Sequence, residues 1–370
     1  MTSASTQPTH EDPGKDSDHT EPRTRAERYV DQYQELTQAA NDAGLMGRRL
    51  GFYWVMIITA VLAVAAIMVG VVYLGDTWYQ LILAALLGVV LAQFGFLGHE
   101  AAHQQVFDSP KWNQWVGRIL AGLCTGLSYG WWMDKHNRHH ANPNKEGEDP
   151  DVASRVLVFT PEASDRRTGW AASLAKRQGF YFLPLLFFEG LSLHVASIRA
   201  LTTRPALKQR WPELAFLTVR HVGYVVFLFV VLPPGMAVGF FAVQVGVFGF
   251  LLGGAFAPNH IGMPTVPHNA DIDFLRRQVL MSRNVRGGIL VHFFMGGLEY
   301  QVEHHLFPRA ARPNLPQLRG IVRHYCERYD VTYTETSLWQ AFKTLLAYLN
   351  QVGIKNRDPF TCPLVRQYRG

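Results

Sequence analysis

The strongest constraint on the fold is a set of long apolar runs. Residues 52–74 and 78–98 contain no Asp, Glu, Lys or Arg, and similar runs follow at residues 214–232 and 236–257. At about 1.5 Å per residue, each run is long enough as a helix to cross the roughly 30 Å hydrocarbon core of a bilayer. Charged residues make up only 17% of the chain, against about 25% in soluble domains. Because the backbone must satisfy its own hydrogen bonds in lipid, the runs predict an all-α integral membrane protein with four transmembrane helices.

The rest of the chain divides around these runs. Residues 1–22 contain almost no large apolar side chain, a composition that cannot form a core and predicts a disordered tail. We expect residues 23–50 to form a cytosolic helical lead-in and residues 51–316 to form the membrane domain. Residues 317–370 should then form a helical cytosolic segment, because apolar residues recur at helical spacing near their end.

One further stretch, residues 180–198, is apolar enough to suggest a fifth span, but it contains Pro184, Glu189 and His194. Parity argues against a fifth span. With four spans, the three histidine motifs described below lie on one side of the membrane, whereas with five the third motif lies opposite the first two. We therefore expect an interfacial or re-entrant helix here.

The basic residues indicate the orientation. Of 35 Lys and Arg residues, 6 precede the first run, 14 lie in the long middle loop and 14 follow the fourth run, while residues 75–77 and 233–235 have none. The remaining one, Arg220, lies inside the third run beside His221. The positive-inside rule then predicts that both termini and all histidine motifs are cytoplasmic, and we expect a bacterial cell membrane. This distribution explains the basic composition without a nucleic-acid partner.

Three short histidine motifs are the second unusual feature of the chain. They contain seven of the 15 histidines and read His99-Glu-Ala-Ala-His103, His136-Asn-Arg-His139-His140 and Gln301-Val-Glu-His304-His305. Residues three or four apart share one face of a helix, so each motif can direct several imidazoles at one point. Neutral imidazole suits Fe, Zn, Cu and Ni. With His260, which follows the fourth run, the motifs predict one cytosolic site that holds more than one metal ion.

The chemistry of such a site depends on the metal. Iron with open coordination positions activates dioxygen, whereas zinc is redox-silent. A site at the cytosolic mouth of a membrane bundle would face lipidic substrates, and oxidation of an unactivated alkyl C–H bond fits both features. A competing interpretation takes His99-Glu100-Ala-Ala-His103 as the HExxH motif of a membrane zinc protease, but it leaves most of the other histidines unexplained. A non-catalytic metal-binding membrane protein is a third alternative.

The three motifs resemble the histidine boxes of the membrane fatty acid desaturases. HEAAH matches HxxxH, HNRHH matches HxxHH, and QVEHH with the following Leu-Phe-Pro matches the QxxHH variant of the front-end and acyl-CoA desaturase-like branch. The resemblance implies a di-iron centre that uses O2 and two external electrons to insert a cis double bond into a long-chain acyl group. A hydroxylase of the same architecture, acting on an alkane, sterol or carotenoid, is the nearest alternative.

The resemblance also implies roles for individual residues. The iron ligands would be the seven histidines of the motifs, with His260 as an eighth: His99, His103, His136, His139, His140, His304 and His305. Nearby polar residues are candidates to orient the imidazoles, because hydrogen-bond acceptors fix the tautomer of a metal-bound histidine: Glu100, Asn142, Asn144, Asp149, Asp151, Asn259 and Gln301. Trp131 and Trp132, just before the second motif, are candidates to line a substrate channel.

Relatives in this family sometimes carry a fused cytochrome b5-like domain with a His-Pro-Gly-Gly motif. The present sequence contains no such motif, so we expect a separate electron donor. A ferredoxin with its reductase, or a free cytochrome b5, would suit the basic cytosolic surface. The acyl substrate would be a CoA thioester or a lipid.

Overall fold

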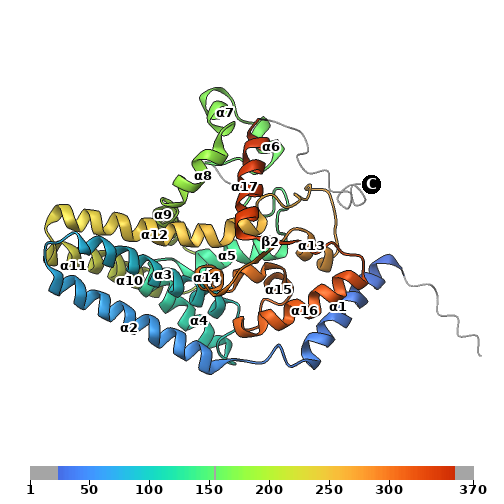
Figure 1. Ribbon diagram of the computed structural model, residues 1–370, viewed down its shortest axis with the longest axis horizontal. Coiled ribbons are helices and arrows are strands. Elements are labelled where there is room, and N and C mark those ends of the chain that lie inside the picture. Colours follow the sequence, from blue (N-terminus) through green and yellow to red (C-terminus); the bar gives the residue numbers. More distant parts are fainter. Residues whose placement is uncertain (1–23, 154–155, 355–370) are drawn as a thin grey trace, which may run out of the picture.

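Four helices in the described part of the chain are long and apolar enough to cross a membrane, which confirms the predicted architecture. The computed structural model describes residues 24–153 and 156–354, so the tail predicted to be disordered lies outside it. The four are α2 (Leu50–Leu74), α3 (Tyr79–Ala102), the continuous run Arg210–Val231 and α12 (Pro234–His260). Figure 1 shows them side by side, with most of the remaining helices at one end of the bundle.

The third span is not a regular α-helix. It consists of α10 (Arg210–Thr218), the π-helix η2 (Val219–Gly223) and α11 (Tyr224–Val231). A second π-helix, η1 (Ile119–Thr125), follows α4 (Pro110–Arg118) and packs against η2. The intramembrane Arg220 donates from Nε to the carbonyl of Cys124 at 2.9 Å, and His221 Nδ1 lies 2.9 Å from the carbonyl of Leu217. π-turns disturb the regular backbone hydrogen bonds. Arg220 therefore satisfies a carbonyl group of η1, and His221 faces a carbonyl group one turn earlier in its own span.

The ambiguous stretch at residues 180–198 forms a bent pair rather than one straight helix. α8 (Gln178–Leu186) contains Pro184, and α9 (Glu189–Thr203) follows at an angle of 72°. The pair exposes large apolar side chains such as Phe180 and Phe188. Proline inside a helix removes a backbone hydrogen bond, and α8 ends two residues after Pro184, directly before the bend.

Close backbone contacts hold α9 against α12. A Cβ atom on Gly249 would collide with the backbone nitrogen of Gly190 and would lie 2.9 Å from the carbonyl oxygen of Leu186. Small residues allow helix backbones to approach closely in membranes, where the hydrophobic effect does not drive helices together. This contact fixes the bent pair beside the fourth span, and thereby fixes one wall of the cavity described below.

One end of the bundle carries a helical cap with its own apolar core. The cap contains α1 (Arg25–Asp42), α13 (Phe274–Leu280), α15 (Gln301–Leu306) and α16 (Leu315–Arg328), and its core includes Leu36, Val279, Leu306 and Leu318. Shorter helices complete the polypeptide between these elements: α5 (Tyr129–Ala141), α6 (Pro161–Asp165), α7 (Gly169–Ala175), α14 (Ile289–Met295), η3 (Leu298–Tyr300) and η4 (Arg312–Asn314). The predicted helix near the C-terminal end is α17 (Leu338–Gly353), which packs against α8.

A short parallel strand pair, which the all-helical expectation did not include, leads into α17. β1 (Asn284–Arg286) pairs with β2 (Glu335–Ser337), in a register that joins Asn284 to Glu335. The pair connects the segment before the third histidine motif to the start of α17. The Tyr348 hydroxyl on α17 then donates to the carbonyl of Phe159 at 2.6 Å. Together these contacts bring the last described helix against the middle loop.

We predict that Gly249→Val destabilises the protein whereas Gly254→Val does not. The added side chain at Gly249 must push α9 away, and overpacking costs about 1–3 kcal/mol. Nothing lies within 4 Å of a Cβ added at Gly254, which is on the same helix. Thermal unfolding of the purified protein in detergent should show a lower Tm for the first variant only. Equal Tm values for the two variants would contradict the proposed contact.

Candidate metal centre

The predicted histidines lie on or directly after four helices that meet at one end of the bundle. His99 lies in the last turn of α3, and His103 directly follows that helix. The second motif lies on α5, His260 ends α12, and the third motif forms α15. Ser128 begins α5 by accepting a hydrogen bond from the backbone N–H of Trp131. The convergence required for a shared site is therefore present in the fold.

Five of the histidines form a first group in which one nitrogen of each lies within 4.8 Å of the others: His99, His103, His136, His140 and His304. Their Nε2 atoms face one another. The Nε2 atom of His136 lies 3.1 Å from that of His99 and 2.8 Å from that of His103, and the Nε2 atoms of His140 and His304 are 3.1 Å apart. Nitrogen lone pairs that converge in this way form a metal-ligand set.

The other three, His139, His260 and His305, form a second group beside the first. Each Nδ1 atom faces an oxygen. His139 faces Asp149 Oδ2 at 2.9 Å, His260 faces the Met281 carbonyl at 3.0 Å, and His305 faces Gln278 Oε1 at 2.9 Å. An Nδ1–H donated to an oxygen fixes the tautomer and leaves the Nε2 lone pair free for a metal ion. The buried Nε2 atom of His305 has no hydrogen-bond partner, which fits this interpretation.

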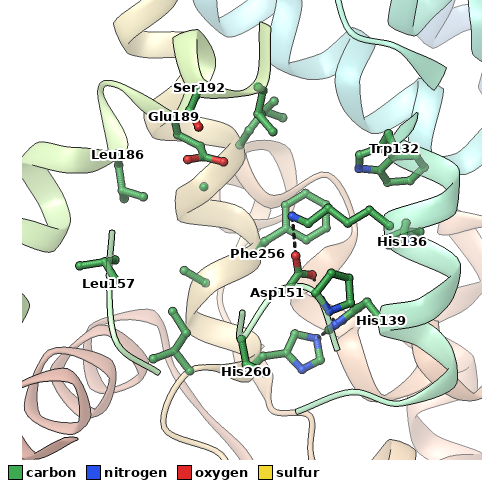
Figure 2. Close-up of a pocket in the computed structure, with 18 of the residues that line it drawn as sticks. Trp132, His136, His139, Asp151, Leu157, Leu186, Glu189, Ser192, Phe256 and His260 are labelled. Carbon is green, nitrogen blue, oxygen red and sulfur yellow. Dashed lines mark hydrogen bonds and ion pairs between the residues drawn. The ribbon is translucent and has the colours of Figure 1, made fainter. Parts of the chain in front are cut away.

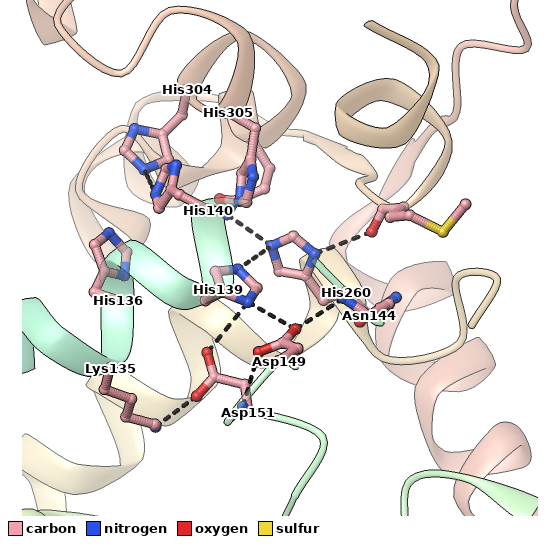
Figure 3. A network of polar contacts seen from close by, with 12 residues as sticks. Lys135, His136, His139, His140, Asn144, Asp149, Asp151, His260, His304 and His305 are labelled. Atoms are coloured by element: carbon pink, nitrogen blue, oxygen red, sulfur yellow. Dashed lines mark hydrogen bonds and ion pairs between the residues drawn. The ribbon is translucent and has the colours of Figure 1, made fainter. Parts of the chain in front are cut away.

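The loop after the second motif supplies acceptors to this second group (Figure 3). Asp149 accepts from the backbone N–H of Asn144 at 2.8 Å as well as facing His139. Asp151 Oδ2 lies 3.4 Å from the same His139 nitrogen, and its Oδ1 lies 2.5 Å from the ammonium of Lys135. Asn144 itself donates to the carbonyl oxygen of His260 and so joins the loop to the end of α12.

Burial sets the charge state of the histidines. It lowers the pKa of His103 to about 3 and holds the pKa values of His136, His304 and His305 well below their usual range. Burial acts in the same direction on His139, but the Asp149 carboxylate raises its pKa above the usual value. Most of the imidazoles are therefore neutral at pH 7, which is the form that binds a metal ion.

Like Asn144, four further candidate orienting residues contact groups other than an Nδ1 atom. The Asn142 side chain accepts from Arg277, and Asn259 donates from Nδ2 to Gln301 Oε1 at 3.1 Å. Gln301 Nε2 lies 2.9 Å from His260 Nε2, the ring nitrogen that faces the other two histidines of the second group. The fourth, Glu100, is described next.

Glu100 forms a buried ion pair with Arg312, which follows the third motif. Arg312 donates from Nε to Oε1 at 2.5 Å and from Nη2 to Oε2 at 2.8 Å, and both side chains are almost fully buried. In the zinc-protease alternative Glu100 would have to activate water, but both of its oxygens are occupied by the guanidinium. The pair instead ties the first histidine motif to the end of the third.

Two side chains that support the site were not singled out from the sequence. Gln278 on α13 donates to the carbonyl of His140 at 3.0 Å while its Oε1 faces His305. Glu303, within the third motif, accepts from Asn284 and from the hydroxyl of Tyr333. Burial raises the pKa of Glu303 to about 7 despite these two donors. No sequence motif distinguishes Gln278, because its partners come from segments that only the fold brings together.

A cavity of about 520 Å³ adjoins the histidine groups and extends between α9 and α12 (Figure 2). His99, His136, His139 and His260 form part of its wall. Most of the remaining wall is apolar, including Phe96, Leu186, Leu193, Leu252 and Phe256. Trp132 lines the cavity and stacks on His136 with ring centroids 4.2 Å apart, whereas Trp131 is not among the lining residues. The site can therefore hold an apolar ligand directly beside the imidazoles.

A sequence profile of the fatty acid desaturase family matches residues 76–337, which include all three histidine motifs. This chain belongs to the fatty acid desaturase family. The predicted family is thereby confirmed, and its similarity extends from the turn before α3 to the end of β2.

Individual desaturases show the same relationship at low identity. The chain is 28% identical over 311 residues to the acyl-lipid (9-3)-desaturase of Physcomitrium patens, covering 81% of this chain and 58% of that protein. It is 30% identical over 278 residues to the Delta(8)-fatty-acid desaturase of Euglena gracilis, covering 72% and 66%. For the Delta(6)-fatty-acid desaturase fat-3 of Caenorhabditis elegans, the identity is 27% and the coverage 88% and 75%. The matched part is thus less than two thirds of the length of the first two desaturases.

We predict that Gln278→Leu weakens metal binding by about 10- to 100-fold, the usual effect of removing a group that orients a metal ligand. Gln178→Leu is the matched control, because Gln178 is also buried and hydrogen-bonded, but to the backbone of Val158 and Leu349. Metal content of the folded fraction, measured by mass spectrometry after dialysis against a chelator, should fall for the first variant only. Equal retention in both variants would show that Gln278 does not support the site.

We also predict that Arg312→Met destabilises the fold by about 3–5 kcal/mol, because it leaves the buried Glu100 carboxylate unpaired. The double variant Glu100→Gln with Arg312→Met should recover a large part of that loss. Thermal unfolding of the two variants and the wild type measures the difference. If the double variant is as unstable as the single one, the charge of Glu100 does not account for the effect.

Proposed function

We propose that this protein is an O2-dependent fatty acyl desaturase that introduces a cis double bond into a long-chain acyl group. The observation that carries the proposal is the juxtaposition of eight converging imidazoles with an apolar cavity. The reaction removes two hydrogens from neighbouring methylenes and uses one O2, two electrons and two protons to form two water molecules. Family membership and the names of the relatives support this chemistry.

Two iron ions are the proposed cofactor. The donor set fits them, because imidazole is a good ligand for iron and the fixed Nδ1–H groups leave the Nε2 atoms free. The first ion would be held by His99, His103, His136, His140 and His304, and the second by His139, His260 and His305, with Gln301 beside the second group. When bound, the ions would supply the O2 activation that an unactivated C–H bond requires.

The polypeptide would supply binding, orientation and exclusion of water. The apolar wall would bury the alkyl chain, and Trp132 and Phe256 would keep it against the imidazoles. Asp149, Gln278 and the ion pair of Glu100 with Arg312 would keep the ligands in position. A dry, apolar site limits the loss of a reactive oxidant to side reactions.

We further propose that both termini and the metal centre lie on the cytosolic side of a bacterial membrane. The distribution of basic residues supports this orientation. The substrate would be an acyl-CoA or an acyl-lipid, and the electrons would come from a separate ferredoxin with its reductase or from cytochrome b5. A basic cytosolic surface suits an acidic carrier of this kind. The division of the chain at residues 22, 50 and 316 is part of the same proposal.

Expression in a bacterial host without desaturase activity tests the proposal. Gas chromatography with mass spectrometry should detect acyl chains that are two hydrogens lighter, and the purified protein should contain about two iron ions per chain. His304→Ala should abolish the product and lower the iron content. Products that gain oxygen would instead indicate a hydroxylase, and zinc without iron would contradict the proposed cofactor.

A further inference from the structure

The cavity contains one basic side chain beside the metal centre. Among the described residues that line it, Lys135 is the only Lys or Arg. It lies on α5 directly before His136, and 35% of its side chain is exposed. Because Lys135 is one of the residues that line the cavity, its side chain can meet a ligand there. Two acidic residues, Asp151 and Glu189, also line this cavity (Figure 2).

The position of the ammonium is tied to the second histidine group. Lys135 Nζ lies 2.5 Å from Asp151 Oδ1, and Asp151 Oδ2 lies 3.4 Å from Nδ1 of His139. The path from Lys135 Nζ to His139 Nε2 therefore consists of these two contacts, the Asp151 carboxylate and the imidazole ring. With ordinary bond lengths, these two nitrogens are at most about 10 Å apart. Figure 3 shows Lys135, Asp151 and His139 in this connected arrangement.

An ammonium has three N–H donors and no acceptor. The contact with Asp151 occupies one donor, so the others can serve a ligand in the cavity. An acyl group offers only one kind of acceptor near its alkyl chain, the carbonyl oxygen of its ester or thioester. The rest of the cavity wall is mostly apolar, which leaves Lys135 as the charged donor that can fix one end of the chain.

We propose that Lys135 binds the carbonyl oxygen of the acyl substrate and thereby determines which methylenes reach the metal centre. The proposal rests on the proposed desaturase function and adds the residue that sets the position of the double bond. An extended alkyl chain advances about 1.3 Å per carbon, given a C–C bond of about 1.5 Å. With the carbonyl held at Lys135, the double bond would form at a fixed number of carbons from the carbonyl group.

A different role for Lys135 would be to hold Asp151 against His139, without contact to the substrate. The two roles predict different responses. A residue that only holds Asp151 affects metal retention, and Asp151→Asn should then have the same effect as Lys135→Met. A residue that binds the carbonyl oxygen affects the discrimination between ligands with and without that oxygen, and Asp151→Asn should leave this discrimination intact.

The experiment compares binding of palmitoyl-CoA with that of S-hexadecyl-CoA, the thioether that lacks the carbonyl oxygen. Full-length protein in nanodiscs is titrated with each ligand for the wild type, Lys135→Met, Asp151→Asn and Lys145→Met. Lys145 is the matched control, because it pairs with Glu148 at 2.9 Å in the adjacent loop and does not line the cavity. Iron content is measured for every variant, and binding requires no turnover.

We expect the wild type, Asp151→Asn and Lys145→Met to bind the thioester about tenfold or more tightly than the thioether, the usual effect of a hydrogen bond to a charged donor. Lys135→Met should bind the two ligands equally. In turnover with an acyl-CoA or a phosphatidylcholine, this variant should raise KM by a similar factor and spread the double bond over neighbouring positions. The form of substrate that reacts identifies whether the carbonyl belongs to a thioester or an ester.

A Lys135→Met variant that keeps both the discrimination and the double-bond position of the wild type would overturn the proposal. Loss of iron in Lys135→Met and Asp151→Asn alike, with discrimination retained, would also overturn it in favour of the role through Asp151. If the iron-loaded wild type forms no product, the proposed function fails. The binding comparison would still decide whether Lys135 recognises the carbonyl oxygen.

Discussion

The structure depends on holding eight imidazoles together, most of them neutral, with their Nε2 atoms directed at common points. A histidine in water is free to protonate and to change tautomer, and neither change is compatible with a shared metal site. Burial keeps most of the rings neutral, and oxygen acceptors on the Nδ1 side of His139, His260 and His305 fix the orientation of the second group. The bundle and the cap are both needed, because neither carries all eight rings.

The two halves of the site are joined by different kinds of contact. The ion pair between Glu100 and Arg312 connects the end of α3 to the segment after α15 through a buried, bidentate hydrogen-bonded contact. Gln278 connects α13 to both the second and the third histidine motifs. Buried polar groups of this kind are effective only when each has its partner. The metal centre therefore depends on Gln278, which contacts a histidine of the site, and also on Glu100 and Arg312, which contact each other.

The sequence predicted the parts of the fold that depend on local composition. Four apolar runs gave four helices of spanning length, and Pro184 marked the stretch that bends instead of crossing as one helix. The histidine spacing predicted that the rings converge, and Asp149 was identified as an acceptor because it lies in the loop after the second motif. The partner of Glu100 was not predictable in this way, because Arg312 is 212 positions away and carries no motif. The pairing of β1 with β2 was also missed, since strands of three residues give no periodic signal.

The late position of α17 in the chain has a consequence for biogenesis. Tyr348 on this helix lines the cavity, and α17 packs against α8 on the far side of the middle loop. Every histidine of the metal centre precedes α17 in the chain, so the imidazoles are synthesised before the helix that contributes this part of the cavity wall. Until α17 has packed against α8, the groups that would hold a metal ion would lie in a cavity more open to water than the one in the finished fold.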